Sequence, residues 1–98
     1  MSYSVRFSKS ARGDMIRHYA YLLDSDESLA IRAFTAIQKS MVVLEEFPFS
    51  CRKASAETPL LRELIIPFGA SGYIALFEIG EDIVTILAIR HQREDDYH

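Results

Sequence analysis

The chain has 98 residues, a length that fits one small domain, and we expect a single domain over residues 1–98. Its composition is 49% hydrophobic and 26% charged, which excludes a disordered chain, and its formal net charge of -3 argues against a strong nonspecific grip on nucleic-acid phosphates. Cys51 is the only cysteine, so neither a disulfide within one chain nor a cysteine-rich metal site can form.

The sequence also argues against a membrane segment and a bound cofactor. No segment approaches the roughly 20 apolar residues that a membrane helix needs, and the opening "MSYSVRFSKSARGD" lacks the apolar stretch of a signal peptide. The histidines at 18, 91 and 98 do not have metal-ligand spacing, and "GASG" lacks the lysine of a phosphate-binding loop. We therefore expect a cytoplasmic protein without metal, cofactor or membrane partner.

The first half of the chain predicts a strand and two helices. In "YSVRFS" apolar residues alternate with polar ones, which is typical of a strand. Ser8 or Ser10 can then cap a helix over residues 9–23, on which we expect His18, next to Arg17, to lie at the surface. Asp26 or Ser28 can cap a second helix that ends near Phe47. Its apolar stripe comprises Ala30, Ala33, Phe34, Ile37, Met41 and Leu44.

The second half predicts a loop followed by three strands. Residues 48–59 form the loop, and the runs "LLRELIIP", "GYIALFEI" and "DIVTILAIRHQ" are rich in strand-forming residues with turn signals between them. Tight connections predict an antiparallel meander, and the first strand is the natural neighbour of the last one. The predicted fold is α+β, with the order β-α-α-β-β-β and a two-helix hairpin on one face of an antiparallel sheet.

This arrangement leaves apolar residues on a sheet face that the helices do not cover. Either loop 48–59 folds over that face, or a partner protein binds there, and we favour the partner. Leu76 and Ile89 are candidate contact residues, although spacing alone does not show which of them lies on the uncovered face. The apolar residues that occupy both faces are Ile74, Ala75, Leu76, Phe77, Val84, Ile86, Leu87 and Ile89.

Two polar groups of residues are candidates for function. The chain end "LAIRHQREDDY" carries Arg90, His91, Arg93 and Tyr97, which could either cut RNA together with Arg62 or grip another protein. Ordinary structural roles remain open for each, such as an ion pair of Arg90 with a sheet glutamate. A local basic cluster near the N-terminus, with only Asp14 against it, comprises Arg6, Lys9, Arg12 and Arg17.

The strings "VRFSKSARGDMIRHYAYL", "FPFSCR" and "LRELIIPFGASGYIALFEI…VTILAIRHQREDDY" resemble the RelE/ParE superfamily of bacterial toxins, with a closer likeness to the ParE branch. Cys51 stands where the family often has a glycine. The resemblance implies the toxin of a type II toxin–antitoxin system, held inactive in a hetero-oligomer with a cognate ParD-like antitoxin. It also implies that operator DNA is bound only through the antitoxin, whose acidic segment would fold over the apolar face and meet the basic cluster.

The resemblance leaves three activities open: inhibition of DNA gyrase, ribosome-dependent cleavage of mRNA, and antitoxin binding without activity. Cleavage needs a base, an acid and cations around the phosphate, which Arg62, Arg90, His91, Arg93 and Tyr97 could supply. However, the chain is acidic, and adjacent residues such as Arg90 and His91 leave opposite faces of a strand. We therefore favour gyrase inhibition, with no catalytic residue, and with the polar chain end acting as a set of contact groups.

Overall fold

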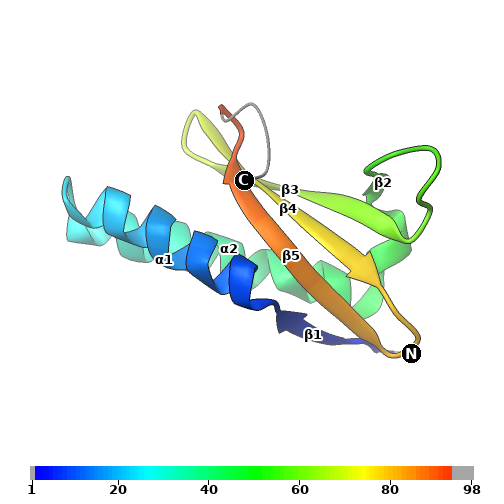
Figure 1. Ribbon diagram of the computed structural model, residues 1–98. Helices are drawn as coiled ribbons and strands as arrows, with labels where there is room; N and C mark the ends of the chain where they lie inside the picture. The colour runs from blue at the N-terminus through cyan, green and yellow to red at the C-terminus, as the bar shows by residue number, and fades with distance from the viewer. Residues whose placement is uncertain (1, 94–98) are drawn as a thin grey trace.

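Two long helices and a sheet make up the part of the chain that the computed structural model describes, residues 2–93 (Figure 1). The strand–helix–helix order and the later strands agree with the fold predicted from the sequence. The elements are β1 (Ser4–Phe7), α1 (Lys9–Leu23), α2 (Glu27–Glu46), the short 3₁₀ helix η1 (Pro48–Ser50), β2 (Arg52–Lys53), β3 (Leu61–Phe68), β4 (Ser71–Ile79) and β5 (Ile83–His91).

The sheet is mixed rather than fully antiparallel. Its strand order is β1-β5-β4-β3-β2, so β1 is the neighbour of β5 as predicted. However, β1 runs parallel to β5, whereas the other neighbouring strands run antiparallel. No hairpin joins β1 to β5, and therefore no turn forces them to be antiparallel. The expected loop also contributes β2, which adds a two-residue strand beside β3.

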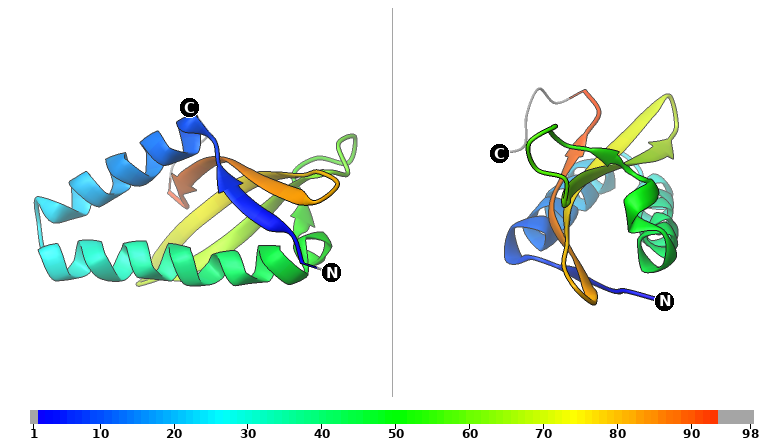
Figure 2. Two further views of the ribbon diagram at one scale, coloured as in Figure 1. Left: turned by 90° about the horizontal axis from the view of Figure 1, so that it is seen from below. Right: turned by 90° about the vertical axis from the view of Figure 1, so that its right-hand side faces the viewer.

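Both helices begin and end where local chemistry requires. The Ser8 hydroxyl accepts a hydrogen bond from the Ala11 N–H, and the Asp26 carboxylate accepts from the first turn of α2. Helix α2 ends at Glu46, because Pro48 disfavours a helical conformation in the residue before it. The two helices form an antiparallel hairpin on one side of the sheet (Figure 2), with α1 packed mainly on β5 and α2 on β3.

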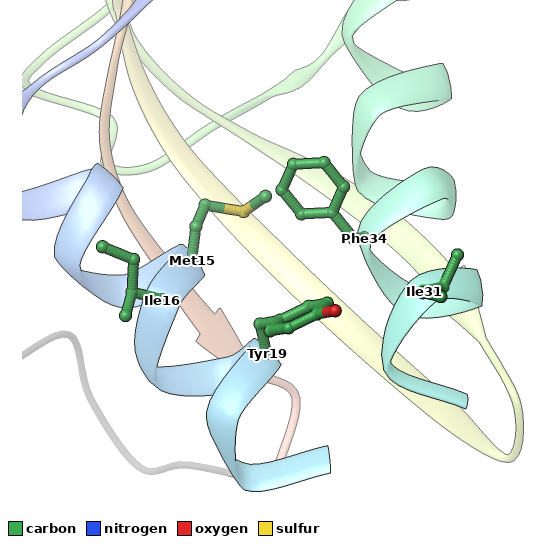
Figure 3. Close-up of a pocket in the computed structure, with 5 residues that line it drawn as sticks. All are labelled: Met15, Ile16, Tyr19, Ile31 and Phe34. Carbon is green, nitrogen blue, oxygen red and sulfur yellow. The ribbon is translucent and has the colours of Figure 1, made fainter. Parts of the chain in front are cut away.

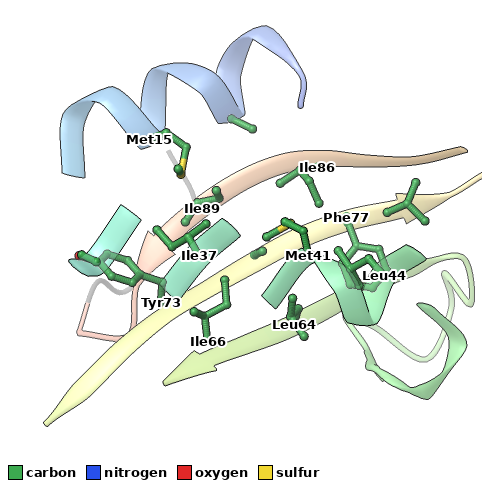
Figure 4. Close-up of a cluster of buried hydrophobic side chains, with 14 of the residues drawn as sticks. Met15, Ile37, Met41, Leu44, Leu64, Ile66, Tyr73, Phe77, Ile86 and Ile89 are labelled. Atoms are coloured by element: carbon green, nitrogen blue, oxygen red, sulfur yellow. The ribbon is translucent and has the colours of Figure 1, made fainter. Parts of the chain in front are cut away.

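The core lies between the helical hairpin and this face of the sheet (Figure 4). Phe77 and Ile86, which lie opposite each other on β4 and β5, are fully buried at its centre. The predicted apolar stripe of α2 packs into this core, except that the Phe34 side chain is 39% exposed. The buried members of the stripe are Ala30, Ala33, Ile37, Met41 and Leu44.

A β-bulge in β5 decides which of its residues enter this core. Phe77 lies opposite Ile86 while Leu76 lies opposite Ala88, so Leu87 is an extra residue in β5. The extra residue reverses the alternation, and Ile86 and Ile89 both face the helices. Ile89 is fully buried there. The expectation that Ile89 contacts a partner is therefore wrong, because its side chain lies in the core and does not reach the surface.

The sheet face opposite the helices is only partly covered by the chain itself. Ile74 and Ala88 are buried on this face, whereas Leu76 is half-buried and Ile65 is 47% exposed. Leu76, the other candidate contact residue, therefore lies on the uncovered face. At the margin of the face, the Arg52 guanidinium forms an ion pair with Glu63 at 2.9 Å.

Candidate functional site

Helix α1 is fastened to β5 by two polar side chains that lie one turn apart. Asp14 accepts a hydrogen bond from the Ile89 N–H at 2.8 Å. The His18 Nε2 lies 2.8 Å from the Ile89 carbonyl oxygen, and because a carbonyl can only accept, the imidazole N–H is the donor. His18 is 8% exposed, so the expectation that it lies at the surface is wrong. The polar imidazole can be buried because it donates a hydrogen bond to the Ile89 carbonyl, which has no partner on β1 because β1 ends at Phe7.

A pocket of about 550 Å³, which we call the polar pocket, opens beside this junction between α1 and the end of the sheet where β3 and β5 end and β4 begins. It brings together three of the residues selected from the sequence: Arg17, His91 and Arg93. Among the described residues that line it, none is acidic. The complete lining is Arg17, His18, Tyr21, Leu22, Phe68, Tyr73, His91 and Arg93.

Tyr73 lies at the base of this pocket and joins its aromatic groups. Its ring makes edge contacts with His18 at 5.0 Å and with His91 at 5.5 Å between ring centroids, and it also lies beside Phe68. The Tyr73 ring is buried, and its hydroxyl forms no hydrogen bond with the residues that the structure describes. Burial raises the pKa of Tyr73 above its ordinary value, so the hydroxyl stays protonated at neutral pH and can donate.

His91 is held in one orientation by hydrogen bonds to both ring nitrogens. Its Nδ1 accepts from the Arg93 backbone N–H at 3.2 Å, which leaves the proton of the neutral ring on Nε2. Nε2 lies 3.2 Å from the Ser71 hydroxyl oxygen. Gly72, next to Ser71, has φ +136°, and a Cβ there would meet the Ile66 carbonyl oxygen. The turn that carries Ser71 therefore depends on a glycine at this position.

The structure does not bring together the four described residues of the alternative nuclease set, Arg62, Arg90, His91 and Arg93. Arg90 lies opposite Ile74 on the uncovered face, whereas His91 faces the pocket on the helix side. Arg62 lies at the other end of the sheet and donates to the carbonyls of Phe49, Cys51 and Pro59. Its guanidinium also lies 5.3 Å from the centroid of the Phe49 ring. Tyr97 is outside the described residues. Of the four described members of the set, His91 and Arg93 alone share a site.

The basic cluster expected near the N-terminus is dispersed over the surface. Arg6 lies on β1, opposite Thr85, and is exposed. Arg12 and Arg17 are five residues apart on α1, which places them about 140° apart around the helix axis. Arg17 forms an ion pair with Asp14 at 3.7 Å and reaches the polar pocket. Of the four basic residues, which include Lys9, Arg17 alone lines this pocket.

A second, apolar hollow of about 430 Å³ lies between the two helices (Figure 3). Met15 and Tyr19 from α1 extend towards Phe34 from α2, and the Tyr19 and Phe34 rings meet edge to face at 6.3 Å. Ile16 and Ile31 complete the lining and are exposed. Four exposed or half-exposed apolar side chains around one hollow form a surface of the kind that binds another polypeptide.

Among comparisons with known proteins, the family model for the ParE toxin of the type II toxin–antitoxin system parDE matches residues 5–96 of this chain. The chain belongs to this toxin family. Two related proteins from Caulobacter vibrioides have a length similar to that of this chain. "Toxin RelE3" is 33% identical over 93% of this chain and 96% of the relative, and "Toxin RelE1" is 29% identical over 96% and 98%.

Solved structures of two toxin–antitoxin systems share the fold of this ParE-family toxin. The chromosomal ParDE system of P. aeruginosa contains a chain with a TM-score of 0.74 and 19% identity, over 92% of this chain and 96% of that one. The RelBE2 complex of Mycobacterium tuberculosis contains a chain with a TM-score of 0.65 and 20% identity, over 96% and 95%. At these identities the likeness shows the fold alone.

Several residues of the polar pocket were not selected from the sequence. Tyr73 and Phe68 lie in runs that predict ordinary strands, and Ser71, which contacts the pocket residue His91, lies in a predicted turn. His18 was expected at the surface of a helix, and Tyr21 was not singled out. The available signal was the pair of histidines, one on a helix and one at a strand end, but sequence spacing does not show that a fold brings them together.

Within residues 2–93, no helix has the length and hydropathy to cross a membrane.

Proposed function

We propose that this ParE-family toxin acts by inhibiting DNA gyrase and that a ParD-like antitoxin neutralises it. The observation that carries the choice of target is the separation of Arg62 and Arg90 from His91 and Arg93. In-line cleavage of RNA needs a base, an acid and cations around one phosphate. Arg62 instead holds backbone carbonyls of residues 49–59, and Arg90 lies on the opposite sheet face from His91. Contact with a target protein does not require those groups to converge.

The neutralising antitoxin would cover the apolar surfaces that the toxin leaves open. The hollow between α1 and α2 is lined by Met15, Tyr19 and Phe34, and the uncovered sheet face carries Leu76 and Ile65. A segment that folds on binding can wrap both surfaces of a small domain. In this proposal the complex is a hetero-oligomer in the cytoplasm, and operator DNA is bound through the antitoxin.

Ribosome-dependent mRNA cleavage is the second candidate function. The observation in its favour is the polar pocket, because His91, Arg93 and Arg17 lie around one cavity. Both nitrogens of His91 are already engaged, by Ser71 and by the Arg93 N–H. A base at this position would have to break one of these hydrogen bonds. The net charge of -3 also opposes entry into a site built of phosphates.

The two functions are separated by assaying one toxin preparation on both targets. Purified toxin is titrated into gyrase with relaxed plasmid, and separately into ribosomes programmed with mRNA. We expect loss of supercoiling, or gyrase-dependent DNA breaks, with the mRNA left intact. The matched control is the same toxin mixed beforehand with its antitoxin, which should restore supercoiling. Normal supercoiling at saturating toxin together with cleaved mRNA would establish the nuclease instead.

A further inference from the structure

The polar pocket between α1 and the β3–β4 turn has the chemistry of an anion-binding site. Arg17 and Arg93 place guanidinium groups around it, and none of its described lining residues is acidic. Arg17 also forms an ion pair at 3.7 Å with Asp14, which does not line the pocket. The Arg93 guanidinium has no hydrogen-bond or ion-pair partner among residues 2–93. Guanidinium groups around a cavity bind carboxylates strongly, since they can donate two parallel hydrogen bonds.

The base of the pocket supplies a further donor. The Tyr73 ring is 3% exposed, yet its hydroxyl forms no hydrogen bond within the described part of the chain. Because burial raises the pKa of Tyr73, this hydroxyl keeps its proton and can donate to an incoming oxygen. His18 and His91 fix the position of the ring through their edge contacts. The donor is therefore held in place before any ligand arrives.

The walls of the pocket are apolar or aromatic. Leu22 and Phe68 are partly buried against the core, and Tyr21 is 74% exposed at the rim. Tyrosine and arginine around a concave site are typical of residues that dominate the binding energy of protein interfaces. A ligand that fits this lining carries an anionic group beside an aliphatic or aromatic one.

We infer that this pocket receives an acidic side chain of the antitoxin, with an adjacent apolar residue packed against Leu22 and Phe68. This inference rests on the proposed neutralisation by an antitoxin and adds the site and the chemistry of one anchor. A single-stranded nucleic acid fits less well. Tyr73 offers no exposed ring face for base stacking, so stacking would fall to Tyr21 at the rim, away from the donor at the base, and the net charge of -3 opposes a phosphate backbone.

The test is a binding measurement between the full-length toxin and the antitoxin encoded beside it. We expect Arg93→Gln to weaken binding about tenfold, because it removes a charge-assisted hydrogen bond. Tyr73→Phe removes only the hydroxyl and should weaken binding by a smaller factor. Arg32→Gln, an exposed arginine of α2 outside the pocket, is the matched control and should leave the affinity unchanged. Thermal melting of each variant verifies that it is folded.

A double-mutant cycle identifies the acidic partner. Each Asp or Glu of the antitoxin is replaced by its amide and measured against wild-type toxin and Arg93→Gln. One replacement should lower the affinity for wild-type toxin about tenfold and the affinity for Arg93→Gln only slightly. This coupling between the two residues should become smaller in high salt. Additive effects for every acidic residue would overturn the inference.

The remaining outcomes separate this inference from the proposed function. Tight antitoxin binding that Arg93→Gln and Tyr73→Phe both leave unchanged would overturn the pocket assignment while the neutralisation stands. No binding by wild-type toxin would overturn the neutralisation and the inference together. Displacement of the antitoxin by a short single-stranded oligonucleotide, lost in Arg93→Gln, would assign the pocket to nucleic acid instead.

Discussion

Asp14 and His18, one turn apart on α1, bind the two backbone polar groups of a single residue of β5. Asp14 accepts from the Ile89 N–H, and His18 donates to the Ile89 carbonyl. In a parallel pair both groups of a strand residue point to the same neighbour, and β1 ends at Phe7, short of this position. The two side chains therefore take the place of a missing strand.

Removing either side chain should destabilise the fold. Asp14→Ala leaves a buried N–H without an acceptor, a loss that typically costs about 1–3 kcal/mol. Asp14→Asn keeps an amide oxygen in the same place and should cost less. Urea unfolding followed by circular dichroism measures both changes. Equal stability of Asp14→Ala and wild type would show that the Ile89 N–H finds another acceptor.

Leu76 and Ile89 should behave in opposite ways when a charge is introduced. Ile89 is fully buried on the helix side, so Ile89→Glu should prevent folding, and even Ile89→Ala should cost about 2–5 kcal/mol. Leu76 is half-buried on the uncovered face, so Leu76→Glu should fold and lose affinity for the antitoxin. Thermal melting and a binding titration on the same samples separate the two effects. A folded Leu76→Glu with unchanged affinity would place the antitoxin elsewhere.

This pair also shows how far the sequence could predict the structure. Local signals placed the helices correctly, because Ser8, Asp26 and Pro48 act on their immediate neighbours. The period of two would put Ile86 and Ile89 on opposite faces, yet the bulge at Leu87 puts them on the same face. No glycine or other local signal marks this bulge, so spacing could not decide between Leu76 and Ile89.

The candidate site was predictable only in part for a related reason. Strand alternation already separates Arg90 from His91, as the sequence predicts, but the same bulge decides that His91 faces the helices and Arg90 the other side. His18 looked like a surface residue because its partner, the Ile89 carbonyl, lies 71 residues away. Arg62 was a candidate for the alternative nuclease set, and its partners are carbonyls of a loop. Contacts across such distances depend on packing rather than on local spacing.

Arg62 should prove to be a structural residue. Its guanidinium donates to the carbonyls of Pro59 at 2.7 Å, Cys51 at 2.9 Å and Phe49 at 3.1 Å, so it ties residues 49–59 to β3. A lysine has one donor group and cannot reproduce this fork. Arg62→Lys should therefore lower the free energy of unfolding by about 1 kcal/mol and speed proteolytic cleavage of residues 54–60.

Activity assays on Arg62→Lys distinguish this role from a catalytic one. Under the proposed function the folded variant inhibits gyrase at wild-type concentrations. Arg32→Lys, which exchanges the same residues at an exposed position of α2, controls for the change of side chain. Unchanged stability with lost toxicity would mean that Arg62 contacts the target.

The stability of the toxin should fall in alkaline solution for two separable reasons. Burial raises the pKa of Tyr73 above 10.0, and burial, opposed by a hydrogen bond with Ser50 and the charge of Arg62, raises the pKa of the Cys51 thiol above 9.0. Above each ordinary value the unfolded chain releases its proton first, so the unfolded state gains stability as pH rises. At pH 7 both groups are protonated in either state and contribute no pH dependence.

Urea unfolding between pH 8 and pH 11 measures these contributions. Cys51→Ala should remove the part of the decline that starts near pH 9.0, and Tyr73→Phe the part that starts near pH 10.0. Each variant serves as the control for the other, since the two declines begin at different pH. A decline that both variants show unchanged would mean that neither group is shielded from water in the folded protein. A hydroxyl open to water would also be a weaker donor at the base of the polar pocket, because water already satisfies it.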